Sequence, residues 1–440
     1  MTKNENAVTS ELTRRDCLKR GTSAFALASM RTLAPLVFAG CADLIPSSER
    51  NAVKVGLLHS QTGQSAMSEM SLRDIELMAI EEINAGGGIL GTQIEPVAED
   101  GGSRATSVFP KKAKKLLSEN KVAVVFGGGT TASRKAILPV FEESNGLLFY
   151  PAPYEGNESS KNIVYTGSTP NQQILPAIDW LLSVAGGSRK QIYLIGSDSV
   201  SSRTTNLIVK KYLQDKSMPV AGETYIPFRQ QNWGILQDIE KAAPDAILST
   251  INGESNESLY HLLAAVENTA DQIPVIAMSV GEDELRHLSS SRIKGLYSSR
   301  SYFQSVDTTA NKEFIGRFQQ EHGYDRVTDD SIEAAYSSVY LWKAAVEKSG
   351  SFDVDKVREA FRSGITFDGP SGELKIDPKT QHTFKRFRLG RVGKKQQFDI
   401  VHQSAENIAP DPYPQSVFPG WSCDWTNGGV TKGAEVKIES

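Results

Sequence analysis

The most informative feature of the sequence is a set of polar residues placed to bind a ligand, with no catalytic motif beside them. Gly127-Gly128-Gly129-Thr130-Thr131 follows a predicted strand and begins a predicted helix, which is where phosphate-binding loops lie. The turn lacks both the lysine of a P-loop and the glycine spacing of a dinucleotide-binding loop. Its backbone N–H groups and the hydroxyls of Thr130, Thr131 and Ser133 could donate hydrogen bonds to a ligand carbonyl or carboxylate, or could simply cap the helix.

Further polar residues follow other predicted strands, at the edge where open α/β sheets bind ligands. One acid at such a place is uninformative, since most acids at strand ends cap a helix or face solvent. The number of polar strand ends is the stronger signal. The candidate ligand-binding residues are Thr130, Thr131, Tyr150, Ala152, Tyr154, Asp198, Ser199, Asn252, Glu254 and Glu282.

The sequence argues against enzymes, metal sites and nucleic-acid binding. It has no Gly-x-Ser-x-Gly motif, no two of its six histidines are three or four residues apart, and its three cysteines are widely scattered. Basic residues (48) and acidic residues (52) nearly balance, and basic residues do not cluster outside the extreme N-terminus. We therefore expect a non-enzyme without a cofactor. An enzyme using Asp198 or Glu254 as a base is the less favoured alternative.

The first 40 residues differ from the rest and resemble an export signal. Arg14-Arg15 with Leu18 and Lys19, followed by a weakly apolar stretch, is typical of a Tat signal; the alternative is a disordered tail. Ala39-Gly40-Cys41 resembles a lipobox in which Cys41 becomes a lipid anchor, although Phe38 replaces the usual leucine; the alternative is a plain signal peptide. We expect residues 41–51 to be a linker and the protein to be periplasmic or at the cell surface.

From residue 52 the chain alternates between predicted strands and helices, which indicates doubly wound parallel sheets. This number of strands requires two sheets. Ser71 is predicted to cap the first helix, and Gly86-Gly87-Gly88 to end it. The predicted strands are 53–58, 122–126, 147–149, 191–195, 246–251 and 273–277. The other predicted helices are about 104–119, 132–145, 170–186, 201–215, 232–243, 255–268, 309–322, 329–349 and 353–363.

Three segments are predicted to connect two lobes and to act as a hinge. They lie at 167–172, 295–303 and 367–370, where strand-like sequence gives way to polar or glycine-containing residues. Lobe 1 is expected to comprise residues 52–168 plus 299–365. Lobe 2 is expected to comprise residues 169–298 plus 366–440, including shorter strands and a proline-rich C-terminal tail.

Many separate motifs resemble one family of binding proteins. They are VKVGLLHS at 53–60, GGGILG at 86–91, ASRKAILPV at 132–140, YPAPYEG at 150–156, TPNQQ at 169–173, YFQSVDT at 302–308 and PDPYP at 410–414. Together they look like the substrate-binding component of urea ABC transporters and the related amide sensor of amidase operons, within the branched-chain amino-acid-binding group of type I periplasmic binding proteins. The resemblance covers about residues 52–414.

The resemblance implies a type I periplasmic-binding-protein fold whose two lobes close on a small molecule and deliver it to an ABC permease in the membrane. The ligand would be urea, a short amide or an amino-acid-like solute. The family has aromatic residues near the ligand where this chain has Gly129 and Ser199, so we expect a larger pocket that binds urea more weakly than a bulkier solute. A sensor that regulates a partner protein is the alternative, but it would not need an export signal.

If Cys41 carries the lipid anchor, its replacement releases the protein from the membrane. We expect Cys41→Ser, expressed in a host with native-like export, to move from the membrane fraction to the soluble periplasmic or medium fraction. Cell fractionation with N-terminal sequencing checks this. A wild-type protein that is already soluble, with its N-terminus elsewhere, would contradict the prediction.

Overall fold

The computed structural model describes residues 52–227, 234–253, 255–265, 273–288, 293, 295–393 and 395–434. All of them belong to one compact unit, residues 50–440. The predicted export signal at 1–40, the linker at 41–51 with Cys41, and Glu254 lie outside the described residues. Within the described ranges, no helix combines the length and the apolar character that crossing a membrane requires.

The first sheet has five parallel strands in the order β2-β1-β3-β4-β5. They are β1 (Ala52–His59), β2 (Gln93–Asp100), β3 (Val125–Gly127), β4 (Leu148–Tyr150) and β5 (Ile163–Tyr165). The sequence analysis did not predict β2. This edge strand is half exposed and contains Pro96, so it lacks the continuous apolar run of the central strands.

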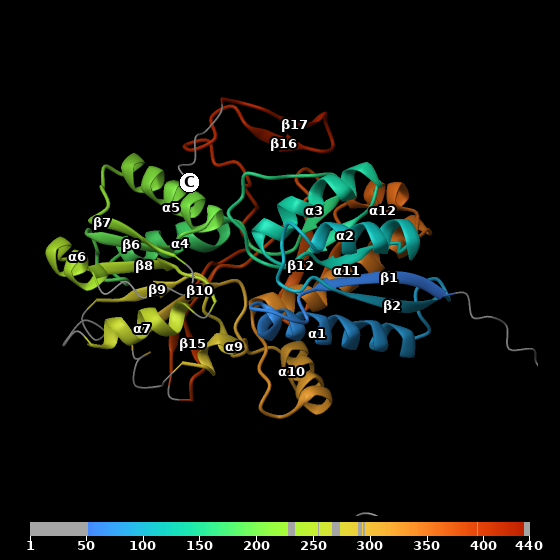
Figure 1. The fold of residues 1–440 in the computed structure, drawn as a ribbon, viewed down its shortest axis with the longest axis horizontal. Coiled ribbons are helices and arrows are strands. Elements are labelled where there is room, and N and C mark those ends of the chain that lie inside the picture. The colour runs from blue at the N-terminus through green and yellow to red at the C-terminus, as the bar shows by residue number, and fades with distance from the viewer. Residues whose placement is uncertain are drawn as a thin grey trace, which may run out of the picture. The chain divides into compact units, whose positions relative to one another are not determined.

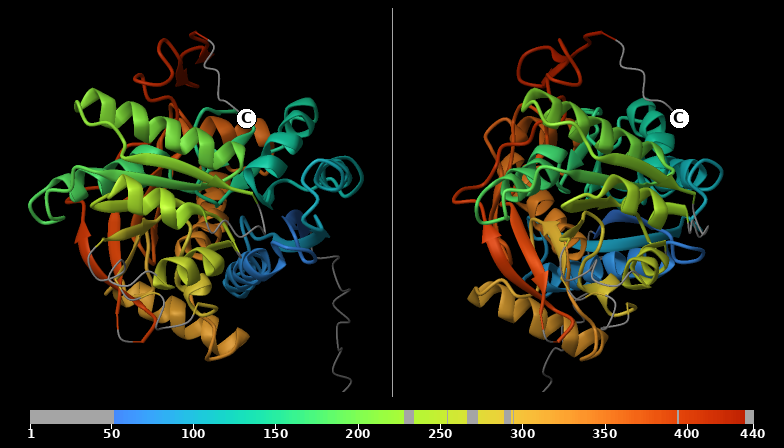
Figure 2. Two further views of the ribbon diagram at one scale, coloured as in Figure 1. Left: turned by 60° about the vertical axis from the view of Figure 1, so that its left-hand side comes forward. Right: turned by 90° about the vertical axis from the view of Figure 1, so that its left-hand side faces the viewer.

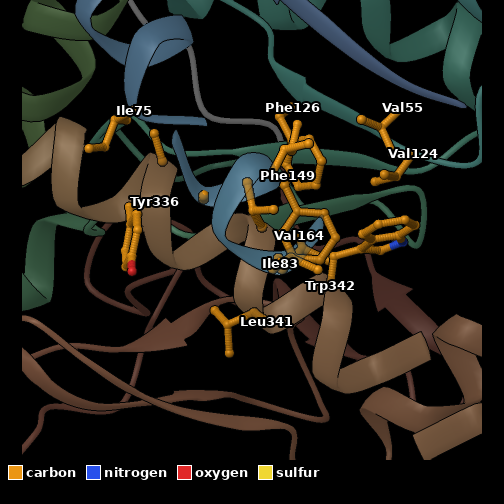
Figure 3. Packing of buried hydrophobic residues seen from close by; sticks show 14 of the residues in the cluster. Val55, Ile75, Ile83, Val124, Phe126, Phe149, Val164, Tyr336, Leu341 and Trp342 are labelled. Atoms are coloured by element: carbon orange, nitrogen blue, oxygen red, sulfur yellow. The ribbon is translucent and has the colours of Figure 1, made fainter. Parts of the chain in front are cut away.

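Helices cover both faces of this sheet (Figure 1), and successive strand residues point to opposite faces. Leu57 of β1 packs in a core with helices α1, α11 and α12, whereas Leu58 packs in a second core with α2 and α3. Figure 3 shows the first core, where Phe126 meets Trp342 edge to face with ring centroids 6.0 Å apart. These helices are α1 (Ala66–Ala85), α2 (Phe109–Lys114) with the π-helical turn η1 (Lys115–Glu119), α3 (Thr131–Glu143), α10 (Thr309–His322), α11 (Asp330–Ser349) and α12 (Val354–Phe361).

Helix α1 begins six residues earlier than predicted. Ser65, not Ser71, is its N-cap, and the Ser65 side chain makes no capping hydrogen bond. Instead, the backbone N–H of Ser60 donates to the Glu69 carboxylate in the first turn at 2.5 Å, a contact that sequence spacing could not reveal. Ser71 is buried inside the helix, and its hydroxyl accepts a hydrogen bond from Arg326. The predicted end of the helix at Gly86 is confirmed.

The second sheet has seven strands in the order β15-β14-β10-β9-β8-β6-β7. The first five in sequence are parallel: β6 (Ile192–Ser197), β7 (Gly222–Ile226), β8 (Ala246–Thr250), β9 (Val275–Ala277) and β10 (Leu296–Arg300). Strands β14 (Arg388–Val392) and β15 (Phe398–Gln403) add an antiparallel edge, seen in orange-red in Figure 2. The associated helices are α4 (Pro170–Leu182), α5 (Val200–Asp215), α6 (Gly234–Ala242), α7 (Ser255–Ala265) and α9 (Glu282–Leu285).

A small third sheet precedes β14. It comprises β11 (Thr366–Gly369), β12 (Gly372–Ile376) and β13 (Thr383–Phe384), and His382 forms a bridge with Tyr165 of β5. The chain therefore enters the second sheet only at Arg388, about 20 residues after the crossing predicted at 367–370.

The C-terminal tail packs against elements from both sheets. Tyr413, Val417 and Phe418 form an apolar cluster with Ile208 of α5. The backbone N–H of Asn157, which follows the first sheet's strand β4, donates to the Pro412 carbonyl at 2.7 Å. The tail ends with the hairpin of β16 (Ser422–Asp424) and β17 (Gly429–Thr431). It thus joins elements of the two sheets, in addition to the covalent connections.

Gly127 is the glycine whose replacement should most disturb the first sheet. Its φ is +112°, and an added Cβ would contact the Leu58 carbonyl and lie 2.8 Å from Cε1 of His59. We expect Gly127→Ala to lower the free energy of unfolding by about 3 kcal/mol, measured with guanidinium chloride. Gly87→Ala is the matched control, because Gly87 has φ +101° but no atom within 4 Å of the new Cβ. Equal losses in both variants would contradict the steric argument.

Candidate ligand-binding site

A cavity lies where the segment after β4 meets the first turns of α4 and α5 and the carboxyl ends of β8 and β9. Its volume is about 70 Å³, and a single water needs roughly 10–15 Å³ measured in the same way, so a molecule of several non-hydrogen atoms fits. The polar residues of the wall are Gln173, Ser201, Ser202, Thr205, Thr250, Asn252 and Ser279. The others are Pro153, Tyr154, Pro170, Ile174 and Met278.

Several polar side chains of the cavity wall are already engaged in holding it together. Ser202 Oγ donates to the Thr250 carbonyl at 2.7 Å. Gln173 Nε2 donates to the carbonyls of Met278 and Ser299 at 2.9 and 2.7 Å. Ser279 Oγ donates to the carbonyl of Ile251. These bonds fix α4, α5 and the ends of β8 and β9 relative to one another.

Three other polar side chains of the wall are available to a ligand. Across the described ranges, the hydroxyls of Ser201 and Thr205 and the amide of Asn252 make no side-chain hydrogen bond, although the backbone N–H of Asn252 donates to Ser197 Oγ at 3.0 Å. All three residues are partly exposed. They can both donate and accept, so they suit a ligand with carbonyl, amide or hydroxyl groups.

Tyr154 is the aromatic residue of the cavity wall, and its side chain is fixed by contacts with other residues of the protein. Its ring stacks on Tyr165 with centroids 5.0 Å apart. Its hydroxyl lies 2.8 Å from the Glu158 carbonyl oxygen and 2.5 Å from Nε2 of His382. The Tyr154 hydroxyl is therefore engaged within the protein and is not free for a ligand.

A fully buried arginine lies behind this wall. The Arg134 guanidinium carbon is 4.8 Å from the ring centroid of Tyr150 and 4.5 Å from that of Tyr154. Arg134 Nε donates to Glu158 at 2.7 Å and Nη2 to Glu155 at 3.3 Å. Burial alone would lower the pKa of Arg134, but the charges of Glu158 and Glu155 outweigh it and raise that pKa. Arg134 therefore stays charged, and its charge is neutralised inside the protein.

The residues predicted at the first sheet have structural partners of their own. Thr130 caps α3 in a capping box with Ser133. Thr131 Oγ1 donates to Glu155 at 2.7 Å. Tyr150 is buried, and burial raises its pKa to about 12. Thr130, Thr131, Tyr150 and the partly buried Ala152 are absent from the cavity wall; of the predicted residues of this half, Tyr154 alone lines it.

The residues predicted at the second sheet divide similarly. Asn252 lines the cavity, whereas Asp198 pairs with Arg203 at 2.8 Å and Ser199 caps α5 by accepting from the Ser202 N–H. Glu282 is completely buried away from the cavity wall; one carboxylate oxygen accepts from the Gln304 N–H at 2.6 Å and the other has no partner. Burial, and then the charge of Asp329, raise the pKa of Glu282 well above its usual range.

The enlarged pocket predicted from Gly129 and Ser199 does not appear. A Cβ on Gly129 would lie 2.7 Å from Cζ of Phe109 and 2.7 Å from Oγ of Ser133, so the space beside Gly129 is already filled. Neither Gly129 nor Ser199 lines the cavity. The prediction was wrong because Phe109, which is 20 residues away in sequence, packs against the turn.

The sequence analysis missed part of the site that did carry a signal. Ser201, Ser202 and Thr205 have the spacing of one helix face and begin a predicted helix directly after a strand. No signal in the sequence indicated His382 and Arg134, because these residues are 228 and 20 positions away from Tyr154, which they contact.

Comparison with known proteins gives a family match over most of the chain. The model of a periplasmic binding protein domain matches residues 53–418. The leucine-, isoleucine-, valine-, threonine- and alanine-binding protein of Pseudomonas aeruginosa is 25% identical over 374 residues, covering 82% of this chain and 94% of that protein. A shorter match, 31% identity over 118 residues, covers 27% of this chain and spans 21% of the length of a limonene hydroxylase from Geobacillus stearothermophilus.

Solved structures share the fold. A solute-binding protein of an ABC transporter from R. palustris, in complex with 4-hydroxybenzoate, superposes with a TM-score of 0.73 at 21% identity, over 81% of this chain and 98% of that one. The substrate-binding protein of the branched-chain amino acid transporter of Streptococcus pneumoniae, in complex with isoleucine, has a TM-score of 0.69 at 17% identity, over 81% and 100% of the two chains. The predicted α/β fold with parallel sheets is thereby confirmed as that of type I periplasmic binding proteins.

His382 should make stability depend on pH in a way that one substitution removes. Burial lowers the pKa of His382 from 6.5 to about 3, so below pH 6.5 the unfolded chain binds a proton that the folded protein does not. As the pH falls from 6.5, the free energy of unfolding of the wild type should therefore decrease relative to that of His382→Gln by about 1.4 kcal/mol per pH unit. The difference should reach roughly 2 kcal/mol at pH 5. Guanidinium chloride unfolding of both proteins at pH 7 and pH 5 measures this. A difference in stability that does not change with pH would contradict it.

Proposed function

The chain belongs to the periplasmic binding protein family, and on that premise we propose that it is the solute-binding protein of an ABC transporter. It captures a small molecule outside the cytoplasm and delivers it to a membrane permease. The observation that carries the proposal is the cavity between Tyr154 and the strand ends of the second sheet, where three polar side chains make no hydrogen bond to any other described residue. Binding without catalysis accords with this wall of hydroxyls, amides and apolar groups.

The proposed ligand is urea or a related short amide. The motifs shared with urea- and amide-binding proteins support this class, and so does the cavity wall. Asn252 can accept from an NH₂ group and donate to a carbonyl, and the hydroxyls of Ser201 and Thr205 can do either. The cavity volume of about 70 Å³ suits a molecule of this size.

Closure of two lobes would enclose the ligand. The proposed lobes are residues 52–168 plus 299–365 and residues 169–298 plus 366–440. Two hydrogen bonds support a hinge that is structured at the first two crossings: Thr166 Oγ1 lies 2.7 Å from Ser338 Oγ, and Ser299 Oγ donates to the Gln173 carbonyl at 2.7 Å. A permease can distinguish loaded from empty protein only if the ligand changes the conformation.

The proposed location is periplasmic or at the cell surface, with Cys41 as a possible lipid anchor. The twin-arginine segment at 13–19 supports export. A cytoplasmic sensor would gain nothing from such a segment, and for this reason the transporter component is preferred.

Titration of the mature protein with urea and short amides tests the proposal. We expect saturating ligand to raise the melting temperature, because it binds only the folded state, and small-angle scattering to show a smaller radius of gyration. Calorimetry establishes saturation for the scattering measurement. Binding without any compaction would contradict lobe closure, and absence of binding to every urea- or amide-like solute would contradict the proposed ligand.

A further inference from the structure

The wall of the cavity contains no charged side chain among the described residues, although it contains seven polar ones. From this we infer that the site selects a small solute that presents a carbonyl or carboxylate oxygen and carries no ammonium group. The inference rests on the proposed function and narrows its ligand. It separates this protein from its relative in Pseudomonas aeruginosa, whose name specifies five amino acids.

Three described carboxylates that flank the wall in sequence are engaged elsewhere, and Glu254, two residues after Asn252, lies outside the described residues. Glu155 and Glu158 neutralise the buried guanidinium of Arg134, behind the Tyr154 ring. Asp198 is paired with Arg203 at 2.8 Å and is absent from the cavity wall. None of these three acids is therefore free to pair with a cation in the cavity.

An ammonium group that leaves water needs a counter-charge or several well-placed acceptors. Among the described residues of the wall, the free groups are two hydroxyls and one amide, from Ser201, Thr205 and Asn252. They would leave the charge of an α-ammonium group uncompensated. An amino acid should consequently bind far more weakly than the same carbon skeleton without the amino group.

The same part of the cavity offers several hydrogen-bond donors to a ligand oxygen. Ser201 and Ser202 lie in the first turn of the 16-residue helix α5, and this turn forms part of the wall. The Ser202 N–H donates to Ser199 Oγ, whereas the N–H groups of the two preceding residues have no partner within the helix and carry partial positive charge. Together with the hydroxyls of Ser201 and Thr205 and the Asn252 NH₂, they favour a carbonyl or carboxylate oxygen.

Ligands that differ by one group provide the test. Calorimetry on the mature protein would compare propanamide, propanoate and alanine, and then 4-methylpentanamide, 4-methylpentanoate and leucine. We expect the amide or the acid of at least one set to bind at least about 100-fold more tightly than the corresponding amino acid. The comparison between the affinities for the amide and for the acid shows whether the site prefers a neutral or an anionic solute.

Substitution of Asn252 tests whether charge is the cause. The substitution Asn252→Asp, in which the two side chains have nearly the same shape, puts a carboxylate in the wall. It should increase the affinity for the amino acid at least tenfold and decrease the affinity for the carboxylic acid. Asn427→Asp is the matched control, since Asn427 is exposed in the C-terminal tail and does not line the cavity. It should change neither affinity.

The possible failures are distinguishable. Amino acids that bind the wild type as tightly as their amides and acids would overturn the inference and leave the solute-binding function intact. If Glu254→Gln then abolished the binding of amino acids, the Glu254 carboxylate would be the group that pairs with their ammonium group. Absence of binding by every compound in both sets would count against the solute-binding function and against the inference with it.

Discussion

A guanidinium group removed from water must keep its charge neutralised, and this requirement organises the segment that walls the cavity. Arg134 is completely buried, with Glu155 and Glu158 as its ionic partners and with the rings of Tyr150 and Tyr154, which meet edge to face, packed against its guanidinium. Such an arrangement adds little stability over an apolar one, but loss of Arg134 would leave the carboxylates of Glu155 and Glu158 buried without the guanidinium that pairs with both. The positions of the two tyrosines are consequently tied to that of α3.

The same cluster links the cavity to the region between the sheets. Tyr154 lines the cavity, and its hydroxyl lies 2.5 Å from His382, whose Nδ1 is 2.8 Å from the Thr380 carbonyl. His382 in turn stacks on Tyr165 with centroids 4.3 Å apart and forms a bridge with β5. A ligand that contacts Tyr154 would thus act on a side chain coupled directly to the segment leading into β14. This contact chain is a physical route from an occupied cavity to the proposed lobe closure.

The opposite wall has a different character. Helices α4 and α5 and the ends of β8 and β9 are held by neutral hydrogen bonds from Gln173, Ser202 and Ser279. Among the described residues, the charged groups of Arg134, Glu155 and Glu158 pack against Tyr154, and the pair Asp198–Arg203 lies outside the wall. Rigid neutral groups on one side and an aromatic ring on the other would give specificity through hydrogen-bond geometry and shape, with no ion pair to the ligand.

The sequence by itself determined the alternation of strands and helices but not every strand, because apolar runs and helical periodicity are local properties, and β2, β7 and β10 are absent from the predicted strands. The prediction of α10 at 309–322 has the observed bounds, whereas β2 was missed because an edge strand lacks a continuous apolar run. For the site, the candidate cavity lies at the edge of the sheets that the sequence indicated, and its wall includes Tyr154 and Asn252 from the predicted residues. Only the tertiary structure decided which polar residues stay free. Thr131 is paired with Glu155 and Asp198 with Arg203, and Phe109 fills the space beside Gly129. These contacts could not be predicted, because pairing and packing depend on neighbours that the spacing of residues along the chain does not specify.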